Sequence, residues 1–318
     1  MNKIIHKLGI PYMGSKRKLA EPIVDFILKY HPNTKYFYDM FGGGGAISFE
    51  AMQRYQIKQV FYNDFNIGIV ELLKKIRTDG VTEEFYKWVD RETFFEHKDD
   101  ETWFGGLCST VWGFGNGSNS YLFGKDIEED RKLLHEIIVN KCYKSLDIIN
   151  KKYNINIKMM MSDDIKKKRI KIIRIIKKLC KTRMDTEQLE RLQQLEQLQQ
   201  LEQLDITNLS YDDIKINTPI NETILYLDPP YENTTKYNKD IYHKDFYKWV
   251  DNLTNKGYIV YLSSYESDLF CVLEMQHRTT LSGTSNNAVV EKLFTNQIAY
   301  DIIQERKLKY EYNINNLF

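Results

Sequence analysis

The four residues Asp228-Pro229-Pro230-Tyr231 have the types and spacing to polarise an amino group on an aromatic base. Such an amine is a poor nucleophile because its lone pair is delocalised into the ring, so a site for its chemistry must supply hydrogen-bond acceptors. The Asp228 carboxylate is one acceptor, and the Pro229 carbonyl is a second, because successive prolines stiffen a turn and remove backbone donors. The Tyr231 ring offers a stacking face worth about 1–3 kcal/mol per base. The alternative is an ordinary strand-ending turn, since Asp and Pro are frequent turn formers.

The tetrad follows an apolar run, residues 224–227, that is typical of a buried strand. Open α/β folds bind their ligands at the carboxyl ends of sheet strands. We therefore expect the tetrad at the ligand-binding edge of a sheet, provided that the rest of the chain supplies the matching elements.

A glycine turn between a predicted strand and a predicted helix indicates a second binding element. Residues 36–40 are typical of a buried strand containing Asp39, the turn Phe41-Gly42-Gly43-Gly44-Gly45 follows, and residues 46–52 predict a helix. Glycines permit a tight turn and the close approach of a ligand, and the first amides of a helix favour a ligand carboxylate. The glycine spacing matches neither a dinucleotide-binding turn nor a phosphate-binding P-loop.

A further predicted strand, residues 59–62, ends in Asn63-Asp64-Phe65-Asn66. An acidic residue at this position can accept both hydroxyls of a ribose. The alternative is that Asp64 caps a helix beginning near Asn66. A ligand with a ribose and a carboxylate fits S-adenosyl-L-methionine, which we predict as the cofactor.

Together these blocks resemble the Dam-like adenine-specific DNA methyltransferases, in which the cofactor motif precedes the catalytic one. The segment 11–18 is similar to the opening motif of that family, and residues 258–265 and 290–294 resemble its closing strands. The resemblance implies catalytic roles for Asp228, Pro229, Pro230 and Tyr231. It implies cofactor-binding roles for Tyr12, Lys16, Asp39, Phe41, Gly42, Gly44, Asp64, Ser210, Tyr211 and Asp228. Ser210-Tyr211 stands where the family usually has an Asp-aromatic pair.

Composition points to a globular protein with reduced thiols. The sequence of 318 residues is 42% hydrophobic, enough for two domains with a real core. Its four cysteines show no paired metal-ligand spacing, so no metal is expected. Because no apolar run approaches 18 residues, we expect no membrane association and a cytoplasmic location.

Positive charge is concentrated in one stretch although the net charge is only +1. Residues 151–183 contain 13 Lys or Arg against two Asp, enough to neutralise DNA phosphates. Residues 162–180 predict an amphipathic helix capped by Ser162. The alternative is an ordinary surface helix with solvated lysines.

Leucine recurs at every third position from Leu189 to Leu204. Because a helix turns about 100° per residue, these leucines spread around its circumference rather than along one face. The pattern predicts a helix that meets more than one neighbour, or a spacer without direct function.

These observations predict a doubly wound, Rossmann-like α/β methyltransferase domain formed by residues 1–80 and 205–318. Residues 81–204 are expected to form an inserted, mostly helical target-recognition region. Its glycine-rich loop, residues 112–120, carries aromatic and amide side chains suited to a DNA groove, with Asn116 and Asn119 as candidate base contacts. Both asparagines are equally plausible as turn residues.

The predicted function is site-specific transfer of a methyl group from S-adenosyl-L-methionine to the N6 amino group of a flipped adenine in double-stranded DNA. A DNA cytosine-N4 methyltransferase, a catalytically inactive DNA-binding relative and a nicotinamide-dependent oxidoreductase are the alternatives, the last disfavoured by the glycine spacing. A cognate restriction endonuclease is a candidate partner, and the chain is expected to act as a monomer.

Overall fold

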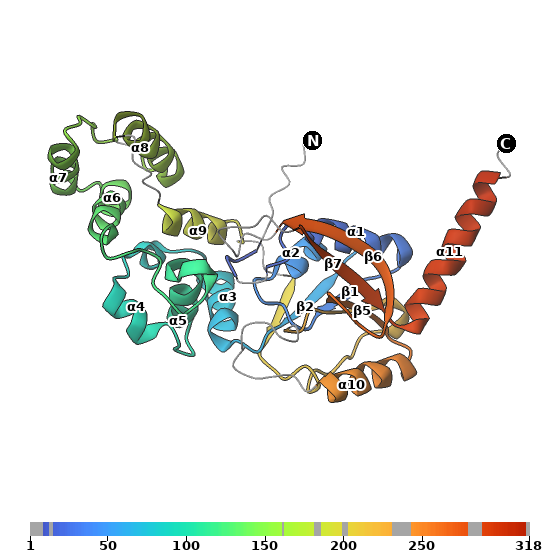
Figure 1. The fold of residues 1–318 in the computed structure, drawn as a ribbon. Coiled ribbons are helices and arrows are strands. Elements are labelled where there is room, and N and C mark those ends of the chain that lie inside the picture. Colours follow the sequence, from blue (N-terminus) through green and yellow to red (C-terminus); the bar gives the residue numbers. More distant parts are fainter. Residues whose placement is uncertain are drawn as a thin grey trace. The chain divides into compact units, whose positions relative to one another are not determined.

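The computed structural model describes residues 9–12, 15–160, 162–180, 186–198, 203–230, 243–278 and 288–315 (Figure 1). The chain divides into two compact units. One comprises the described parts of Ser15–Asn66 and Leu201–Phe318, and the other comprises those of Gly9–Gly14 and Ile67–Gln200. The first boundary between the units lies after Asn66, earlier than the boundary expected at residue 80. The reason is that the helix following Asn66 packs with the second unit.

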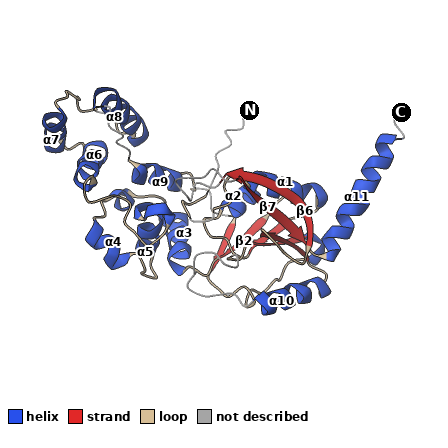
Figure 2. Ribbon diagram, viewed as in Figure 1, coloured by secondary structure: helices blue, strands red, loops and turns tan. Residues whose placement is uncertain are grey.

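The first unit is built on a seven-stranded sheet with the order β3-β2-β1-β4-β5-β7-β6. Figure 2 draws the strands in red. β1 to β5 are mutually parallel, and β7 runs antiparallel between β5 and β6. The strands are β1 Tyr36–Asp39, β2 Gln59–Asn63, β3 Leu204–Thr207, β4 Thr223–Leu227, β5 Ile259–Ser264, β6 Phe270–Arg278 and β7 Ala288–Thr295. Strand order reverses between β1 and β4, so the predicted doubly wound, mainly parallel sheet is confirmed.

Helices cover both faces of this sheet. On one face, α10 (His243–Asn255) packs Phe246 and Val250 against a core formed by Tyr38, Met40, Leu225, Leu227, Val260 and Leu262. On the other face, His31 follows α1 (Ala20–Tyr30), and its Nε2 lies 2.7 Å from the Tyr261 hydroxyl oxygen. Alternate residues of a strand point to opposite faces, and all five residues of β4 are buried. This two-sided burial explains why residues 224–227 are continuously apolar.

Three further elements complete the first unit. α2 (Ala46–Met52) follows the glycine turn, the short 3₁₀ helix Ile220–Glu222 precedes β4, and α11 (Gln297–Asn315) follows β7.

The described residues of the second unit form helices joined by loops, with an isolated β-bridge between Gly113 and Tyr121 (Figure 2). Its α-helices are α3 Ile67–Asp79, α4 Arg91–His97, α5 Trp103–Leu107, α6 Glu128–Asn140, α7 Tyr143–Tyr153, α8 Ile165–Cys180 and α9 Glu187–Glu196. Shorter helical turns cover Glu83–Tyr86, Cys108–Trp112 and Phe114–Asn116.

The basic helix α8 begins later than the sequence suggested. Oδ1 of Asp164 accepts a hydrogen bond from the Lys167 amide at 2.8 Å, which is the contact of a helix N-cap. The predicted cap Ser162 instead accepts from the Asp164 amide at 3.1 Å. Asp164 therefore caps the helix, and the prediction for Ser162 was wrong.

Within the described residues, the leucine repeat forms the helix α9, Glu187–Glu196. Leu189, Leu192 and Leu195 of α9 are fully buried, although they point in different directions around the helix. The helix contacts both Glu83–Tyr86 and Cys108–Trp112, so these leucines meet more than one neighbour, as predicted. Leu204 instead opens β3.

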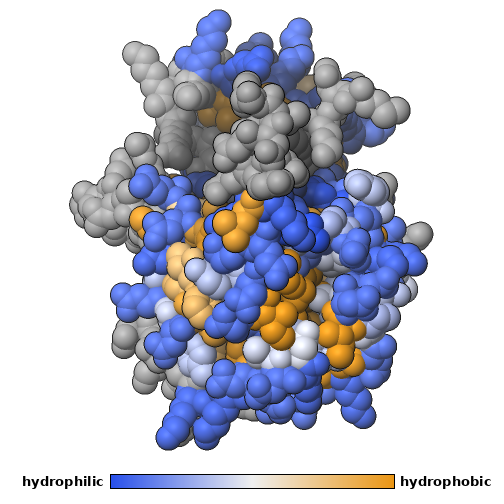
Figure 3. Space-filling model, turned by 90° about the vertical axis from the view of Figure 1, so that its right-hand side faces the viewer, coloured by the Kyte–Doolittle hydropathy of each residue, from blue (hydrophilic) through white to orange (hydrophobic). Residues whose placement is uncertain are grey.

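Hydrophilic side chains dominate the face in Figure 3, with apolar patches between them. Within the described ranges, every helix is too short or too polar to cross a membrane.

Candidate active site

Two predicted site residues lie side by side at the point where the strand order reverses. Asp39 is the last residue of β1 and pairs in register with Tyr226 of the neighbouring β4. Asp228 follows the end of β4 directly. The carboxyl ends of strands at such a reversal point form the usual ligand crevice of doubly wound sheets. The structure thus brings the glycine-turn motif and the catalytic motif to one edge of the sheet.

Asp39 is buried and only half satisfied by the protein. Its Oδ2 accepts hydrogen bonds from the Ser48 hydroxyl at 2.7 Å and from the Ser48 amide at 3.1 Å. Its buried Oδ1 has no donor among the residues that the structure describes. Burial raises the pKa of Asp39 to about 7; the Ser48 hydrogen bonds oppose this shift, whereas the nearby Asp228 and Asp64 carboxylates add to it. The Oδ1 atom of Asp39 can therefore accept a hydrogen bond from a donor group of a ligand.

The glycine turn is held tightly against the end of β2. The Gly42 amide donates to the Asn63 carbonyl at 2.8 Å, and the Tyr62 hydroxyl donates to the Gly43 carbonyl at 2.7 Å. A Cβ on Gly42 would lie 2.1 Å from the Tyr62 ring, and Gly45 has a φ of +73°. These two positions therefore require glycine.

Most amides of this turn are already committed within the chain. Those of Gly42, Gly43, Gly45 and Ser48 donate to the Asn63 carbonyl, the Asp64 carboxylate, the Gly42 carbonyl and the Asp39 carboxylate, respectively. The expectation that a ligand carboxylate binds free amides here finds no support from these four donors.

Asp64 stabilises the turn and also the start of the next segment. Its Oδ2 accepts from the Gly43 amide and its Oδ1 accepts from the Asn66 amide, both at 2.7 Å. The alternative role of Asp64, capping a helix near Asn66, is met only by a turn, because the Asn66 amide precedes the first residue of α3. Burial raises the pKa of Asp64, whereas these two hydrogen bonds oppose the shift. Since a carboxylate oxygen can accept more than one hydrogen bond, the contacts leave capacity for ribose hydroxyls.

Asn63 joins three strand ends and was missed as a site residue. Its Nδ2 donates to the carbonyls of Met40 and Leu209 at 3.2 and 3.0 Å, and its Oδ1 accepts from the Leu209 amide at 2.9 Å. This buried side chain thereby fixes the segment that leads to Ser210 and Tyr211. The only signal in the sequence was its place beside Asp64.

Aromatic rings connect the glycine turn to that same segment. The Tyr211 ring lies 5.6 Å from the Phe41 ring and 4.8 Å from the Trp249 ring, and Phe246 packs against all three. Ser210 donates to the Asp212 carboxylate. Two residues predicted separately as cofactor-binding, Phe41 and Tyr211, are thus brought together.

Lys16 forms ion pairs with two carboxylates at the edge of the sheet. Its Nζ lies 2.9 Å from Oδ2 of Asp228 and 3.4 Å from Oε1 of Glu291 on β7. Burial alone would lower the pKa of Lys16, but these carboxylates more than offset that effect, so its pKa is raised. Glu291 was missed by sequence reasoning, although a glutamate within the apolar strand Val289–Phe294 was a usable signal.

The remaining predicted residues are only partly described. Pro229 is buried and Pro230 half-buried beside Asp228, whereas Tyr231 lies outside the described residues. Tyr12 belongs to the second unit, so its contact with the cofactor stays a prediction. Within the described ranges, no three His, Cys, Asp or Glu side chains are grouped to hold a metal ion.

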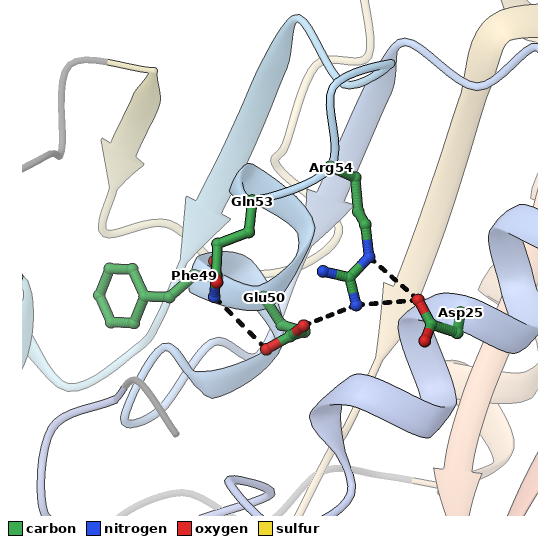
Figure 4. Close-up of polar contacts among 5 residues, drawn as sticks. All are labelled: Asp25, Phe49, Glu50, Gln53 and Arg54. Atoms are coloured by element: carbon green, nitrogen blue, oxygen red, sulfur yellow. Dashed lines mark hydrogen bonds and ion pairs between the residues drawn. The ribbon is translucent and has the colours of Figure 1, made fainter. Parts of the chain in front are cut away.

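The helix that follows the glycine turn is tied to its neighbour by a separate charge network (Figure 4). Arg54 lies 2.6 Å from the buried Glu50 of α2 and 2.8 Å from Asp25 of α1. These charges hold α2 against α1.

In the second unit, a buried arginine supports the glycine-rich loop. Nη1 of Arg191 donates to the carbonyls of Thr110, Val111 and Gly113 at 3.0, 3.1 and 2.7 Å. The Phe114 amide closes the loop by donating to the Ser120 carbonyl at 2.7 Å. The Phe114 side chain is 68% exposed, so the loop presents an aromatic ring to solvent.

Of the loop's two candidate base contacts, the structure describes the side chain of one. Asn119 is exposed, whereas the Asn116 side chain lies outside the described residues.

Comparison with known proteins identifies a family for this chain. Residues 12–306 match the family model for D12 class N6 adenine-specific DNA methyltransferases. A type II methyltransferase, M.MjaIII of Methanocaldococcus jannaschii, is 24% identical over 163 residues, covering 46% of this chain and 50% of that protein. The chain thus spans about half the length of this curated relative. The crystal structure of HI0767 of Haemophilus influenzae, assigned as a methylase, matches with 11% identity and a TM-score of 0.29, covering 87% of this chain and 88% of that one. On the family match, this chain belongs to the D12 class N6 adenine-specific DNA methyltransferases.

Proposed function

We propose that the protein transfers a methyl group from S-adenosyl-L-methionine to the N6 amino group of a flipped adenine in double-stranded DNA. The observation that carries this proposal is the position of Asp228 beside Asp39 at the reversal point of the sheet, in a chain of this family. Asp228 lies at the predicted methyl acceptor site, and Asp39 lies at the predicted methyl donor site.

The residues around the glycine turn fit the cofactor. The unsatisfied Oδ1 of Asp39 would accept a hydrogen bond from the amino group of the cofactor. Asp64 would accept hydrogen bonds from the ribose hydroxyls of the cofactor. Phe41 and Tyr211 would line its adenine ring. We retain Tyr12, Lys16, Gly42, Gly44 and Ser210 as cofactor-binding candidates. The cofactor supplies an electrophilic methyl group on a positively charged sulfur.

The chain's own residues then position the acceptor. Asp228 and the Pro229 carbonyl would accept hydrogen bonds from the adenine amine, which fixes its lone pair toward the methyl group. Tyr231 would stack on the extruded base, which offsets the few kcal/mol of stacking and pairing lost on flipping. Asp228 would take up the surplus proton after transfer, so the site needs alignment and acceptors more than a strong base.

The second unit supplies features suited to DNA. α8 carries much of the basic stretch 151–183, whose lysines and arginines would neutralise phosphates and make binding weaken with salt. The exposed Phe114, on the loop supported by Arg191, would wedge into a groove or a base step. We therefore propose residues 81–204 as the target-recognition region. A cognate restriction endonuclease remains a candidate partner.

A single assay tests this function and separates its rivals. Purified protein, DNA and labelled S-adenosyl-L-methionine would be incubated together, and the hydrolysed nucleosides would be analysed by mass spectrometry. The proposal expects N6-methyladenine. N4-methylcytosine would instead support the cytosine alternative, and cofactor binding in calorimetry without any methylated base would indicate an inactive relative.

A further inference from the structure

Glu291 reaches the candidate active site from a strand that carries none of the predicted motifs. It lies on β7, which runs antiparallel to β5, and its side chain is only 3% exposed. Its Oε1 is 3.4 Å from the Lys16 ammonium, which is itself 2.9 Å from Oδ2 of Asp228. Three segments far apart in sequence thus bring two carboxylates to one cation.

The charge balance of this group bears on the proposed chemistry. A buried Lys16 paired with Asp228 alone would form a neutral pair, and the ammonium would compete with the adenine amine for the carboxylate. The second carboxylate, Glu291, shares the ammonium and leaves the three side chains with a net charge of −1. That negative charge faces an amine that becomes positively charged as the methyl group arrives.

The pKa values of two tyrosines are shifted by these same charged groups. Burial raises the pKa of Tyr265; Glu291 and Asp228 raise it further, whereas Lys16 opposes them. The pKa of the buried Tyr226 is also raised, first by burial and then by Asp228, with a smaller contribution from Glu291. Glu291 and Asp228 therefore act on the same groups at this edge of the sheet.

We propose that Glu291 is a positioning residue for methyl transfer, which shares the Lys16 ammonium so that Asp228 keeps negative charge and acceptor capacity for the target amine. This role rests on the proposed function. In this role Glu291 acts through Lys16, so its contribution should depend on the presence of that lysine.

The test is kinetic and uses the full chain. Glu291→Gln keeps the shape and an acceptor oxygen for Lys16 but removes the charge. We expect kcat to fall on the order of tenfold, as for a change of about one pKa unit in the interaction at a reacting group. The KM for DNA and the calorimetric affinity for S-adenosyl-L-methionine should stay unchanged, since the cofactor contacts are intact.

Glu50→Gln is the matched control. Glu50 is also a buried glutamate in an ion pair, with Arg54, but it lies in the α1–α2 network of Figure 4. It should affect thermal stability to a similar degree while leaving kcat unchanged. A fall in kcat for Glu50→Gln equal to that for Glu291→Gln would overturn the proposed role.

A double-mutant comparison tests transmission through Lys16. In a Lys16→Met background, Glu291→Gln should cause little further loss of kcat. An equal loss in both backgrounds, or a wild-type kcat for Glu291→Gln alone, would overturn the role while leaving the proposed function intact. Absence of methylation by the wild-type protein would overturn the proposed function, and this role with it.

Discussion

The ammonium of Lys16 lies 2.9 Å from Oδ2 of Asp228, at the carboxyl edge of the central strand. The pairing anchors the Asp228 carboxylate within a folded site and does not leave it on a solvent-exposed turn. Both side chains are largely buried, so bulk water screens this interaction only weakly. Asp228 is therefore part of a charged group that connects Lys16 with the end of β4 and with Glu291 of β7.

The raised pKa of Asp39 predicts a pH dependence of stability. Asp39 holds its proton up to a pKa of about 7 when folded, against an ordinary value of 3.8. Between these values the folded state binds more protons than the unfolded state, so stability falls as pH rises through this window. Replacing Asp39 by Asn keeps the shape and removes the titration.

Denaturant unfolding of both proteins between pH 4 and pH 7 checks this expectation. The wild-type protein should lose free energy of unfolding relative to Asp39→Asn as the pH increases. A difference between the two proteins that stays constant across this range would contradict the assigned pKa.

The close packing of Gly42 predicts that Gly42→Ala disturbs the cofactor site. The added methyl group would lie 2.1 Å from the Tyr62 ring, which is itself held by its hydrogen bond to Gly43. The turn must shift, and a misplacement of about 1 Å can cost on the order of a hundredfold in rate. We expect weaker S-adenosyl-L-methionine binding in calorimetry and a correspondingly lower methylation rate.

Gly80→Ala provides the control for this substitution. Gly80 has a φ of +72°, but nothing lies within 4 Å of its added Cβ. Backbone strain should cost about 1–2 kcal/mol of stability, while the cofactor affinity stays unchanged. Equal cofactor binding by the two alanine variants and the wild type would contradict the proposed role of the turn.

The contacts of Arg191 predict that this residue orders the glycine-rich loop. Arg191→Met removes a buried, charged donor from three carbonyls, and hydrogen bonds to charged groups contribute about 1.5–3 kcal/mol. We expect faster amide hydrogen exchange in residues 113–121 and a higher KM for DNA. Cofactor affinity should remain at the wild-type value, and unchanged exchange in the loop would contradict the assignment.

The sequence predicted the parts of the site that follow local patterns. A strand, a glycine turn and a helix, and an apolar run ending in Asp228, each depend on neighbouring residues, and their expected positions at the sheet edge were confirmed. The contact of Asp64 with the Asn66 amide is also local, and it forms a turn just before α3.

Long-range partners could not be read from local patterns. Lys16 meets Glu291 only because β7 inserts antiparallel beside β5, and no periodicity in the sequence encodes that pairing. Ser162 and Asp164 are both good caps, so the choice between them depended on where packing begins α8. The leucine period likewise includes Leu204, but this residue pairs with Val60 of β2 and therefore belongs to the sheet.

Adenine methylation that depends on Asp228 is tested most directly by mapping modified bases in DNA. The DNA would come from cells that express either the wild-type protein or Asp228→Asn. The variant keeps the size of the side chain but cannot take up the proton, and its cofactor binding should be largely intact. We expect N6-methyladenine at a fixed sequence in DNA from wild-type cells and none above background in DNA from cells with the variant. Equal adenine methylation in both DNA samples would contradict this expectation.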